Sequence, residues 1–580
     1  MRHLVILLLT AALLFSACQT NPTSASGDSA KQSSEKAAPA AKVSAADTDS
    51  AVAKISGERI LKGTEVMAAD DMAGRATGTE GELKAAQWIA DQYRDIGLKP
   101  MGDSQDFFQV VNLIGMKKEA DATKLSLKGD AGEIGYKSGE TLTFSSTSQK
   151  EDVSITDAPL LFVGYGVDAP EHEWNDYKDV DVKGKVLLYL NNDPAIADQP
   201  DAFGGEARTY YGRYTYKFEQ AMKRGAAGAF IIHTTPSAGY GWSVIGTSGE
   251  RESFEVKLPN SGYQLDVLGW MHQDLADKLA GTVGATLDQW FEMGNKRDFK
   301  PVELPITLSA TIKTTLRETE ARNVVGVWEG SDPQLKDEVV IFTAHYDHLG
   351  VKESGDGDRV YNGAWDNALG TAAIIEIARA FSESKVRPRR SVAFLACSAE
   401  ERGLLGSKWF VEKPPIPMKN FVANLNVDMP QVLGLSTDMG AIGFESNQLG
   451  DWLVELAGQT KVTAKDGSEK NVSVKGDPNP NAGSFYRSDQ ANFVKKGVPA
   501  IFFVPGKDYV KDLKIDPAKF KSDHYHQVSD EINEHWDLTG CVRDMQIVMR
   551  LAIKVADNDA IPTWAAGNEF EGAWKALHGK

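Results

Sequence analysis

The stretch "DEVVIFTAHYDHLG", residues 337–350, decides the fold of this chain. Residues 339–344, "VVIFTA", form a mainly apolar run of strand length, and His345, Asp347 and His348 follow that run. A short continuous run of β-branched and aromatic residues is typical of a strand that is buried on both faces. The stretch therefore predicts a core strand that ends where polar, chemically active side chains begin.

Three further stretches have the same form, and two longer ones have apolar residues at helical spacing. The additional predicted strands are "RSVAFLAC" (390–397), "FVANLNV" (421–427) and "PAIFFV" (499–504), and the predicted helices are "LGTAAIIEIARAFSES" (369–384) and "QLGDWLVELAGQT" (448–460). The series opens at "RNVVGVWEG" and runs to about residue 555. Alternating strands and helices predict an α/β fold with a mostly parallel, mixed sheet covered by helices on both faces.

Composition excludes some classes of protein. The chain has 580 residues, of which 42% are hydrophobic and 25% charged, so it can build a large core. A formal net charge of −18 argues against nucleic-acid binding, because phosphates would be repelled. Only three cysteines are present, so the chain is not a disulfide scaffold. Cys397 is expected to be a buried thiol, and whether it pairs with Cys541 is left open.

The N-terminus is typical of an exported protein. "MRHLVILLLTAALLFSAC" has a basic start, a short apolar run and small residues before Cys18. The apolar run is too short for a membrane span, so the segment is interpreted as a secretion signal. The ending "LFSAC" resembles the signal of bacterial lipoproteins, and a plain cleaved signal peptide is the alternative. The resemblance implies a cell-envelope lipoprotein of the periplasm or outer membrane, anchored to a membrane through lipidated Cys18.

Acids and histidines follow the predicted strands. In parallel sheets, ligands bind beyond the carboxyl ends of the strands. The candidates at these positions are His345 after the first strand, Glu400 and Glu401 after the second, Asp428 after the third, Asp366 just ahead of the following helix, and His526 in "DHYHQVSDEI" (523–532). Two histidines and several carboxylates at one rim are the ligand set expected for zinc or a similar divalent ion.

Taken singly, these residues have ordinary structural explanations. Asp366 could cap the helix that follows it, Glu401 could interact with a helix dipole, and His345 could lie on the surface. Those explanations do not account for the joint arrival of the residues at strand ends. Nor do they account for the adjacent glutamates, which are tolerable if one binds a cation and the other handles a proton.

Six motifs together resemble the co-catalytic zinc aminopeptidases of metallopeptidase family twenty-eight, which have the zinc exopeptidase fold. They are "HYDH" (345–348), "GAWDNALGTAA" (363–373), "SAEERGLLGS" (398–407), "NVDM" (426–429), "SDQANFVKKGVPAIFF" (488–503) and "YHQVSDEI" (525–532). Between residues 151 and 305, "FVGYGVDAPEHEWNDYKDVDVKGKVLLYL" and "AMKRGAAGAFII" resemble the protease-associated domain, a smaller inserted α/β domain that many members carry.

The resemblance implies a role for each candidate residue. Two zinc ions per chain would be bridged by Asp366, one bound also by His345 and Asp428 and the other by Glu401 and His526. The remaining roles that it implies are Glu400 as the general base, Asp347 as the residue that fixes the imidazole of His345, Asp530 as a similar support near His526, and Tyr525 either as an oxyanion stabiliser or as a packing residue. A cis peptide at Asp366–Asn367 is also implied. Gln490 departs from the family, in which histidine is usual.

The implied activity is that of a metallo-aminopeptidase, a hydrolase that removes N-terminal residues from peptide substrates. A carboxypeptidase or a glutaminyl-cyclase-like enzyme on the same scaffold is the first alternative, and cyclases of this kind use a single zinc ion. The second alternative is a non-catalytic peptide-binding surface protein. The complete ligand set and Glu400 argue against the second.

These inferences divide the chain into six parts. They are a lipoprotein signal peptide (1–18), a disordered tether (19–50), the N-terminal part of the catalytic domain (51–150), the inserted protease-associated domain (151–305), the catalytic zinc peptidase domain (306–560) and a C-terminal tail (561–580). The tether is expected to lack order because its small, polar residues bury too little apolar surface to offset the entropy of ordering.

Overall fold

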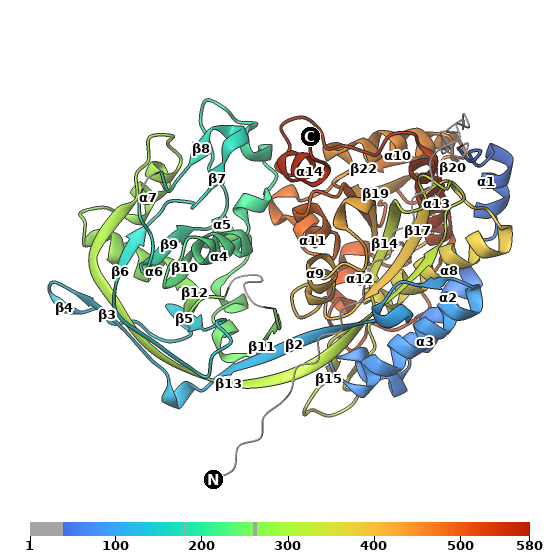
Figure 1. Cartoon of the computed structure of the whole chain (residues 1–580). Helices are drawn as coiled ribbons and strands as arrows, with labels where there is room; N and C mark the ends of the chain where they lie inside the picture. The colour runs from blue at the N-terminus through green and yellow to red at the C-terminus, as the bar shows by residue number, and fades with distance from the viewer. Residues whose placement is uncertain (1–38, 179, 259–263) are drawn as a thin grey trace, which may run out of the picture. The chain divides into compact units, whose positions relative to one another are not determined.

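Two β-sheets share one long strand, β13 (Val302–Trp328), which pairs in one sheet through its first half and in the other through its second half (Figure 1). The computed structural model describes residues 39–178, 180–258 and 264–580. The predicted signal peptide and residues 19–38 of the predicted tether lie outside these ranges.

The first sheet is built on four adjacent parallel strands, in the order β17, β14, β18, β23. Their bounds are Ser391–Cys397, Val339–His345, Phe421–Val427 and Ala500–Val504, and each coincides with a predicted apolar run. Every residue of β14, β17 and β18 is buried. The prediction of a mostly parallel, mixed sheet is confirmed.

Antiparallel strands complete the margins of this sheet. Strand β13 lies antiparallel to β17, and β19 lies antiparallel to β23. The marginal strands are β1 (Lys99–Pro100), β2 (Phe108–Lys118), β11 (Ser253–Val256), β19 (Asp438–Ile442) and β22 (Ser473–Lys475). The parallel strands therefore lie in the middle of the sheet, where helices can cover both of their faces.

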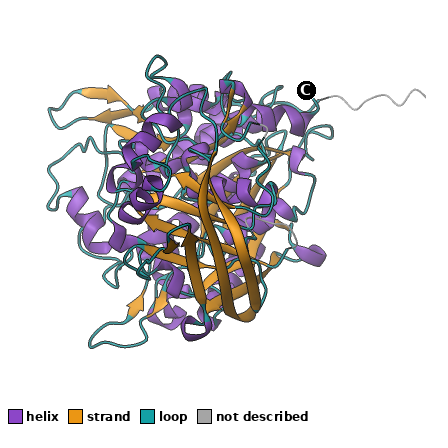
Figure 2. Ribbon diagram, turned by 90° about the vertical axis from the view of Figure 1, so that its left-hand side faces the viewer, coloured by secondary structure: helices purple, strands orange, loops and turns teal. Residues whose placement is uncertain are grey.

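Helices flank the strands on both sides (Figure 2). Successive side chains of β14 point to opposite faces, so that Val340 and Phe342 join one apolar cluster and Ile341 joins another. The first cluster includes side chains of α2 (Gly57–Met67), α3 (Glu80–Ile96), α8 (Leu369–Ser384), α10 (Gln448–Gly458) and α13 (Thr539–Asp557), and the second includes those of α9 (Leu405–Glu412) and α11 (Gln490–Lys495).

The second sheet forms a smaller α/β module. Its parallel strands are β6 (Asp152–Phe162), β9 (Val186–Leu190), β10 (Gly228–His233) and β12 (Val267–His272), and its helices are α4 (Tyr214–Lys223), α5 (Thr235–Ala238), α6 (Gln273–Gly281) and α7 (Leu287–Gly294). These elements lie between residues 151 and 305, where the sequence predicts a smaller inserted α/β domain.

The module begins and ends at other residues than the sequence suggested. Strands β3 (Lys124–Gly129), β4 (Gly132–Glu133) and β5 (Leu142–Ser145) belong to its sheet, because β3 pairs with β13 and β5 pairs with β12. At the other end, residues 306–313 of β13 still pair with β3 and β6. The sheet of the module therefore extends before residue 151 and beyond residue 305, the boundaries predicted from the sequence. Strand pairing sets this extent, and the local sequence does not reveal it.

Two segments expected to be peripheral are packed. Helix α1 (Ala45–Val52) lies within the predicted tether, and its Ala51 and Val52 are buried in the same cluster as α8. Residues 561–580 include α14 (Glu571–His578) and two buried tryptophans, of which Trp564 donates its indole N–H to the carbonyl of Gly497 at 3.0 Å. Residues 45–52 of the predicted tether are thus folded, and the predicted tail packs against the rest of the fold.

Short elements connect the larger helices and strands, and two cysteines are buried in the fold. Helix α12 (Pro517–His524) and the short strands β7 (Asp168–Ala169), β8 (Trp174–Asn175), β15 (Gly350–Val351), β16 (Val360–Tyr361), β20 (Lys461–Thr463) and β21 (Glu469–Asn471) connect the larger ones. Cys397 and Cys541 are both buried free thiols, which confirms the expectation for Cys397 and shows that the two do not pair. Within the described ranges, none of the helices has the length and apolar character needed to span a membrane.

Replacing Trp564 by alanine is expected to lower the free energy of unfolding by about 3–5 kcal/mol, because a buried indole is lost and a cavity remains. Urea unfolding of the two proteins measures the difference. Val454 on α10 is 47% exposed, and its replacement by alanine serves as the control, with a change within about 0.5 kcal/mol. Equal stability of the Trp564 variant and the parent would contradict the packed position of the C-terminal segment.

Candidate metal centre

Three strand ends bring the predicted site residues to one edge of the first sheet. Strand β14 ends at His345, β17 is followed by Glu400 and Glu401, and β18 is followed by Asp428. The carboxyl ends of these strands lie side by side because the strands are adjacent and parallel. The expected convergence of these side chains is therefore present in the fold.

The first group of ligand atoms surrounds His345. Its Nε2 atom lies 3.1 Å from Oδ1 of Asp366 and 3.4 Å from Oδ1 of Asp428. The imidazole is 1% exposed, and Glu400 belongs to the same candidate cation group as His345 and Asp428. A buried histidine between two carboxylates, with a third carboxylate nearby, has the nitrogen and oxygen atoms that bind a divalent cation.

The second group shares Asp366 with the first. Nε2 of His526 lies 3.2 Å from Oδ2 of Asp366 and 3.3 Å from Oε2 of Glu401. The two oxygens of Asp366 therefore face different histidines, because Oδ1 lies next to His345. One carboxylate shared in this way can bridge two cations.

The spacing and the unmet hydrogen bonds of these atoms fit a pair of cations. Ligands bound tetrahedrally to zinc at about 2.0–2.1 Å are separated by about 3.3 Å, and the distances above range from 3.1 to 3.4 Å. Oδ1 of Asp428 and Oε1 of Glu401 are buried without a hydrogen-bond partner in the described part of the chain. Such atoms are costly unless a ligand satisfies them.

The electrostatics show how strongly this cluster favours positive charge. Burial disfavours the charged form of His345, but Asp428, Glu400 and Asp366 outweigh burial and raise its pKa well above the ordinary value. For His526, the adjacent carboxylates of Asp366 and Glu401 likewise outweigh burial and raise the pKa to about 10. Both pKa shifts favour the protonated imidazole when no cation is bound.

Glu400 differs from its neighbour Glu401 in its preferred charge. Burial, together with the nearby carboxylates of Glu401 and Asp428, raises the pKa of Glu400 well above its ordinary value. Burial acts in the same direction on Glu401, but His348 and His526 outweigh it and lower the pKa of that carboxyl. The adjacent glutamates therefore suit different tasks, with Glu401 as an anion and Glu400 as a group that can hold a proton.

Asp347 supports the glutamate pair more directly than it supports His345. Its carboxylate accepts hydrogen bonds from the backbone N–H groups of Glu400 at 2.9 Å and Glu401 at 3.3 Å. Nδ1 of His345 lies 3.2 Å from the backbone carbonyl oxygen of Asp347 and 3.8 Å from the carboxylate. The expected fixing of the imidazole is therefore made mainly by the backbone of Asp347.

The ligands themselves are held by the surrounding chain. Asp530 accepts hydrogen bonds from the backbone N–H groups of Trp365 at 2.9 Å and Asp366 at 3.0 Å, so it supports the shared carboxylate and not His526. The hydroxyl of Ser488 donates to Oδ2 of Asp428 at 2.7 Å. The peptide bond between Asp366 and Asn367 is cis, as the resemblance implied.

Three further residues that the sequence singled out have different positions. The ring of Tyr525 stacks on that of His526 with centroids 3.9 Å apart, and burial raises the pKa of its hydroxyl. Gln490 is fully buried and donates to the carbonyl of Phe485, so it is a packing residue. His524, the other histidine of the stretch "DHYHQVSDEI", faces the carbonyl of Ser529.

Arg75 has a structural role that the sequence did not signal. Its guanidinium is fully buried and donates to the carbonyl oxygens of Tyr346, Asn362 and Gly363, which lie beside the ligands on two loops. Burial lowers its pKa to about 10, although nearby carboxylates such as Asp530 oppose the shift. A lone arginine in the stretch "GRATG" gives no local sign of such contacts.

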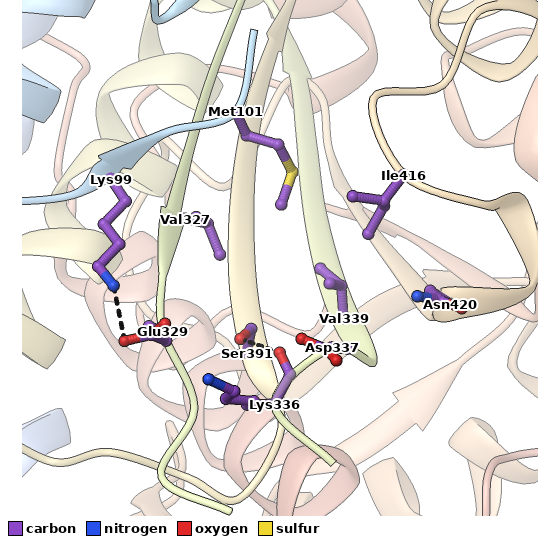
Figure 3. Close-up of a pocket in the computed structure, with 10 residues that line it drawn as sticks. All are labelled: Lys99, Met101, Val327, Glu329, Lys336, Asp337, Val339, Ser391, Ile416 and Asn420. Atoms are coloured by element: carbon purple, nitrogen blue, oxygen red, sulfur yellow. Dashed lines mark hydrogen bonds and ion pairs between the residues drawn. The ribbon is translucent and has the colours of Figure 1, made fainter. Parts of the chain in front are cut away.

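A surface pocket of about 250 Å³ lies elsewhere on the same sheet (Figure 3). Val339 and Ser391, at the amino ends of β14 and β17, help to line it, so it is at the opposite end of the strands from the candidate metal centre. Its acid Glu329 pairs with Lys99 at 2.7 Å, and no histidine lines it. This pocket therefore has no comparable ligand set.

Comparison with known proteins finds a family model that matches part of the chain. Residues 323–549 match the model of Peptidase family M28, and all five predicted ligands lie within that range. A segment of 190 residues is 30% identical to Leupeptin-inactivating enzyme 1 of Streptomyces exfoliatus and covers 33% of this chain and 37% of that protein.

Two other relatives match over shorter segments. One segment of 129 residues is 35% identical to Glutamate carboxypeptidase 2 homolog of Caenorhabditis elegans, covering 21% of this chain and 15% of the relative. Another of 110 residues is 32% identical to Aminopeptidase YwaD of Bacillus subtilis (strain 168), covering 19% and 22%. The chain thus spans less than two fifths of the length of each of these three curated relatives.

Cation binding near pH 7 is expected to release protons. His526, with a pKa of about 10 in the cation-free protein, carries a proton that must leave before Nε2 can bind a metal, so affinity should rise as pH rises toward 10. Calorimetric titration with Zn²⁺ in buffers of different ionisation enthalpy measures the number of protons released. Binding without proton release, and with equal affinity at pH 6 and pH 8, would contradict this description of the site.

Proposed function

We propose that this chain, whose residues 323–549 match the model of Peptidase family M28, is a metal-dependent exopeptidase that removes N-terminal residues from peptides. The observation that carries the proposal is the shared carboxylate of Asp366 between His345 and His526, with Glu400 at the same strand edge. The similarity to an aminopeptidase of Bacillus subtilis supports the choice of the N-terminus as the point of cleavage.

The residues present fit two Zn²⁺ ions per chain. We assign His345 and Asp428 to one ion, Glu401 and His526 to the other, and Asp366 to both. When bound, such a pair of ions polarises the scissile carbonyl group and lowers the pKa of water at the site.

Glu400 is assigned the proton transfer. Its backbone N–H is fixed by Asp347 at 2.9 Å, and its carboxyl group has a raised pKa because it is buried next to other acids. A carboxylate with a raised pKa is a better proton acceptor from water, and it can then donate that proton to the leaving amine. We therefore expect Glu400 to transfer the proton and Asp347 to hold Glu400 in position.

Tyr525, stacked on His526, is proposed to stabilise the developing oxyanion.

The smaller module is proposed to be a protease-associated domain that shapes the substrate pocket. Its Arg208 donates a backbone N–H to the carbonyl of Pro480 at 3.1 Å, and its Tyr210 ring lies 5.9 Å from that of Tyr486. The segment so contacted leads directly to Ser488, which holds Asp428. Substitutions in "RTYYGRYTYKF" (208–218) should therefore alter substrate preference.

A carboxypeptidase is the second candidate function, favoured by the 35% identity to a glutamate carboxypeptidase homolog over a short segment. A cyclase-like enzyme with a single metal ion fits less well, because Asp366 has a histidine on each side. A non-catalytic binding protein would not need Glu400 beside these groups.

The location of the protein is proposed from the sequence alone. The signal-like segment that ends at Cys18 lies outside the described residues, and it supports export and attachment to a membrane of the bacterial cell envelope through lipidated Cys18. Peptides that reach this compartment would be the substrates.

Replacing Glu400 by glutamine is expected to lower kcat by about 100- to 10,000-fold while Zn²⁺ remains bound, because the amide cannot accept the proton. Steady-state kinetics and metal analysis of the same sample measure both effects. Glu412→Gln, an exposed change on α9, is the control and should retain the parent rate. Full activity of the Glu400 variant would refute its assigned role.

Hydrolysis of aminoacyl anilides is expected to need a free N-terminus and to stop when a chelator removes the metal. Acetylating the substrate amine should lower kcat/KM by about 10- to 100-fold, because a hydrogen bond to a charged group is worth about 1.5–3 kcal/mol. Matched peptides with free and amidated C-termini form the control series. If amidation stops cleavage and acetylation does not, the enzyme is a carboxypeptidase and the aminopeptidase proposal is wrong.

A further inference from the structure

His348 is a fully buried histidine beside the second group of ligand atoms. Its imidazole is 0% exposed, and neither ring nitrogen has a hydrogen-bond partner among the described residues. Nδ1 nevertheless lies 2.9 Å from Oε1 of Glu401, an oxygen that is also buried without a hydrogen bond. Two unmet polar atoms so close together need a common explanation.

The contact between His348 and Glu401 has the same form as the contacts between the assigned ligands. Nε2 of His526 lies 3.2 Å from Asp366 and 3.3 Å from Glu401 without forming an aligned hydrogen bond to either. Atoms that bind one cation point their lone pairs at the cation and not at each other, so they lie close together but poorly aligned. The pair formed by His348 and Glu401 shares this signature.

Three ligand atoms from His348, Asp366 and Glu401 also lie within 4.8 Å of one another, which is compatible with one coordination sphere. Glu401 has one oxygen next to His348 and the other next to His526, so both of its oxygens face histidine nitrogens. The imidazoles of His348 and His526 lie with centroids 5.8 Å apart. The side chains thus surround one small volume.

The position of the His348 ring is fixed by its surroundings. A methyl group built on Gly363, which has a φ of +54°, would lie 2.5 Å from Cγ of His348, so the ring is packed directly on that glycine. The backbone N–H of His348 donates to the carbonyl of the buried Arg75 at 3.2 Å. With its ring packed on Gly363 and its backbone bound to Arg75, the side chain has little room to turn toward another partner.

We propose that His348 is a further protein ligand of the second cation, which it binds through Nδ1 together with Asp366, Glu401 and His526. The proposal rests on the function proposed above, since it requires that this group holds a cation. It gives the second site one more nitrogen ligand than the first. The second cation should therefore be the one that the chain retains more tightly.

Calorimetric titration of the metal-free protein with Zn²⁺ tests the proposal through two substitutions. His348→Ala removes the ligand, and His348→Asn leaves an amide N–H near the position of Nδ1 that can donate to Glu401 but binds zinc poorly. Both variants are expected to bind the second ion at least about 100-fold more weakly and to retain the first. His524→Asn is the matched control and should bind both ions as the parent does.

The outcomes separate the possible failures. If His348→Asn binds both ions like the parent while His348→Ala does not, His348 positions Glu401 by a hydrogen bond and the proposal is overturned. If both variants bind two ions normally, His348 has no role in binding. If the parent itself does not bind two ions, the proposed function fails first. Unchanged thermal unfolding of the metal-free variants shows that the fold is intact, and a zinc-loaded crystal structure should place Nδ1 about 2.0–2.1 Å from the ion.

Discussion

The carboxylate of Asp366, with one oxygen next to His345 and the other next to His526, is the contact on which the rest of the site depends. Around it, Glu400, Glu401 and Asp428 are crowded at the same strand edge. Like charges at such distances repel strongly in a buried place, so the arrangement is tolerable only if positive charge is present. The raised pKa values of both histidines express that need in the metal-free protein.

The fold meets this constraint with backbone groups as well as with side chains. The carboxylate of Asp347 accepts hydrogen bonds from the backbone N–H groups of both glutamates, and that of Asp530 accepts them from Trp365 and Asp366. Each of these acids is itself buried, and burial raises the pKa of each to about 6. The loops are thereby fixed before any ligand arrives, which is the preorganisation that a metal site needs.

Much of the core and of the site could be predicted from the sequence because the signals there are local. An apolar run such as that of residues 339–344 identifies a buried strand, and the residue after each strand is known once the strand is known. The edges of the smaller module could not be found in this way. Short amphipathic strands such as Lys124–Gly129 carry no sign of which sheet they will join, and α1 becomes ordered only because Ala51 and Val52 are buried against distant helices.

The sequence by itself determined the α/β class, the strand ends and the identity of the residues expected at the centre. Only the tertiary structure decided which atoms meet: that Asp366 faces His345 with one oxygen and His526 with the other, and that His348 lies 2.9 Å from Glu401. The reason is that periodicity and residue type act within a few residues of the chain. Contacts between positions distant in the sequence depend on how the strands pair and how the loops are packed.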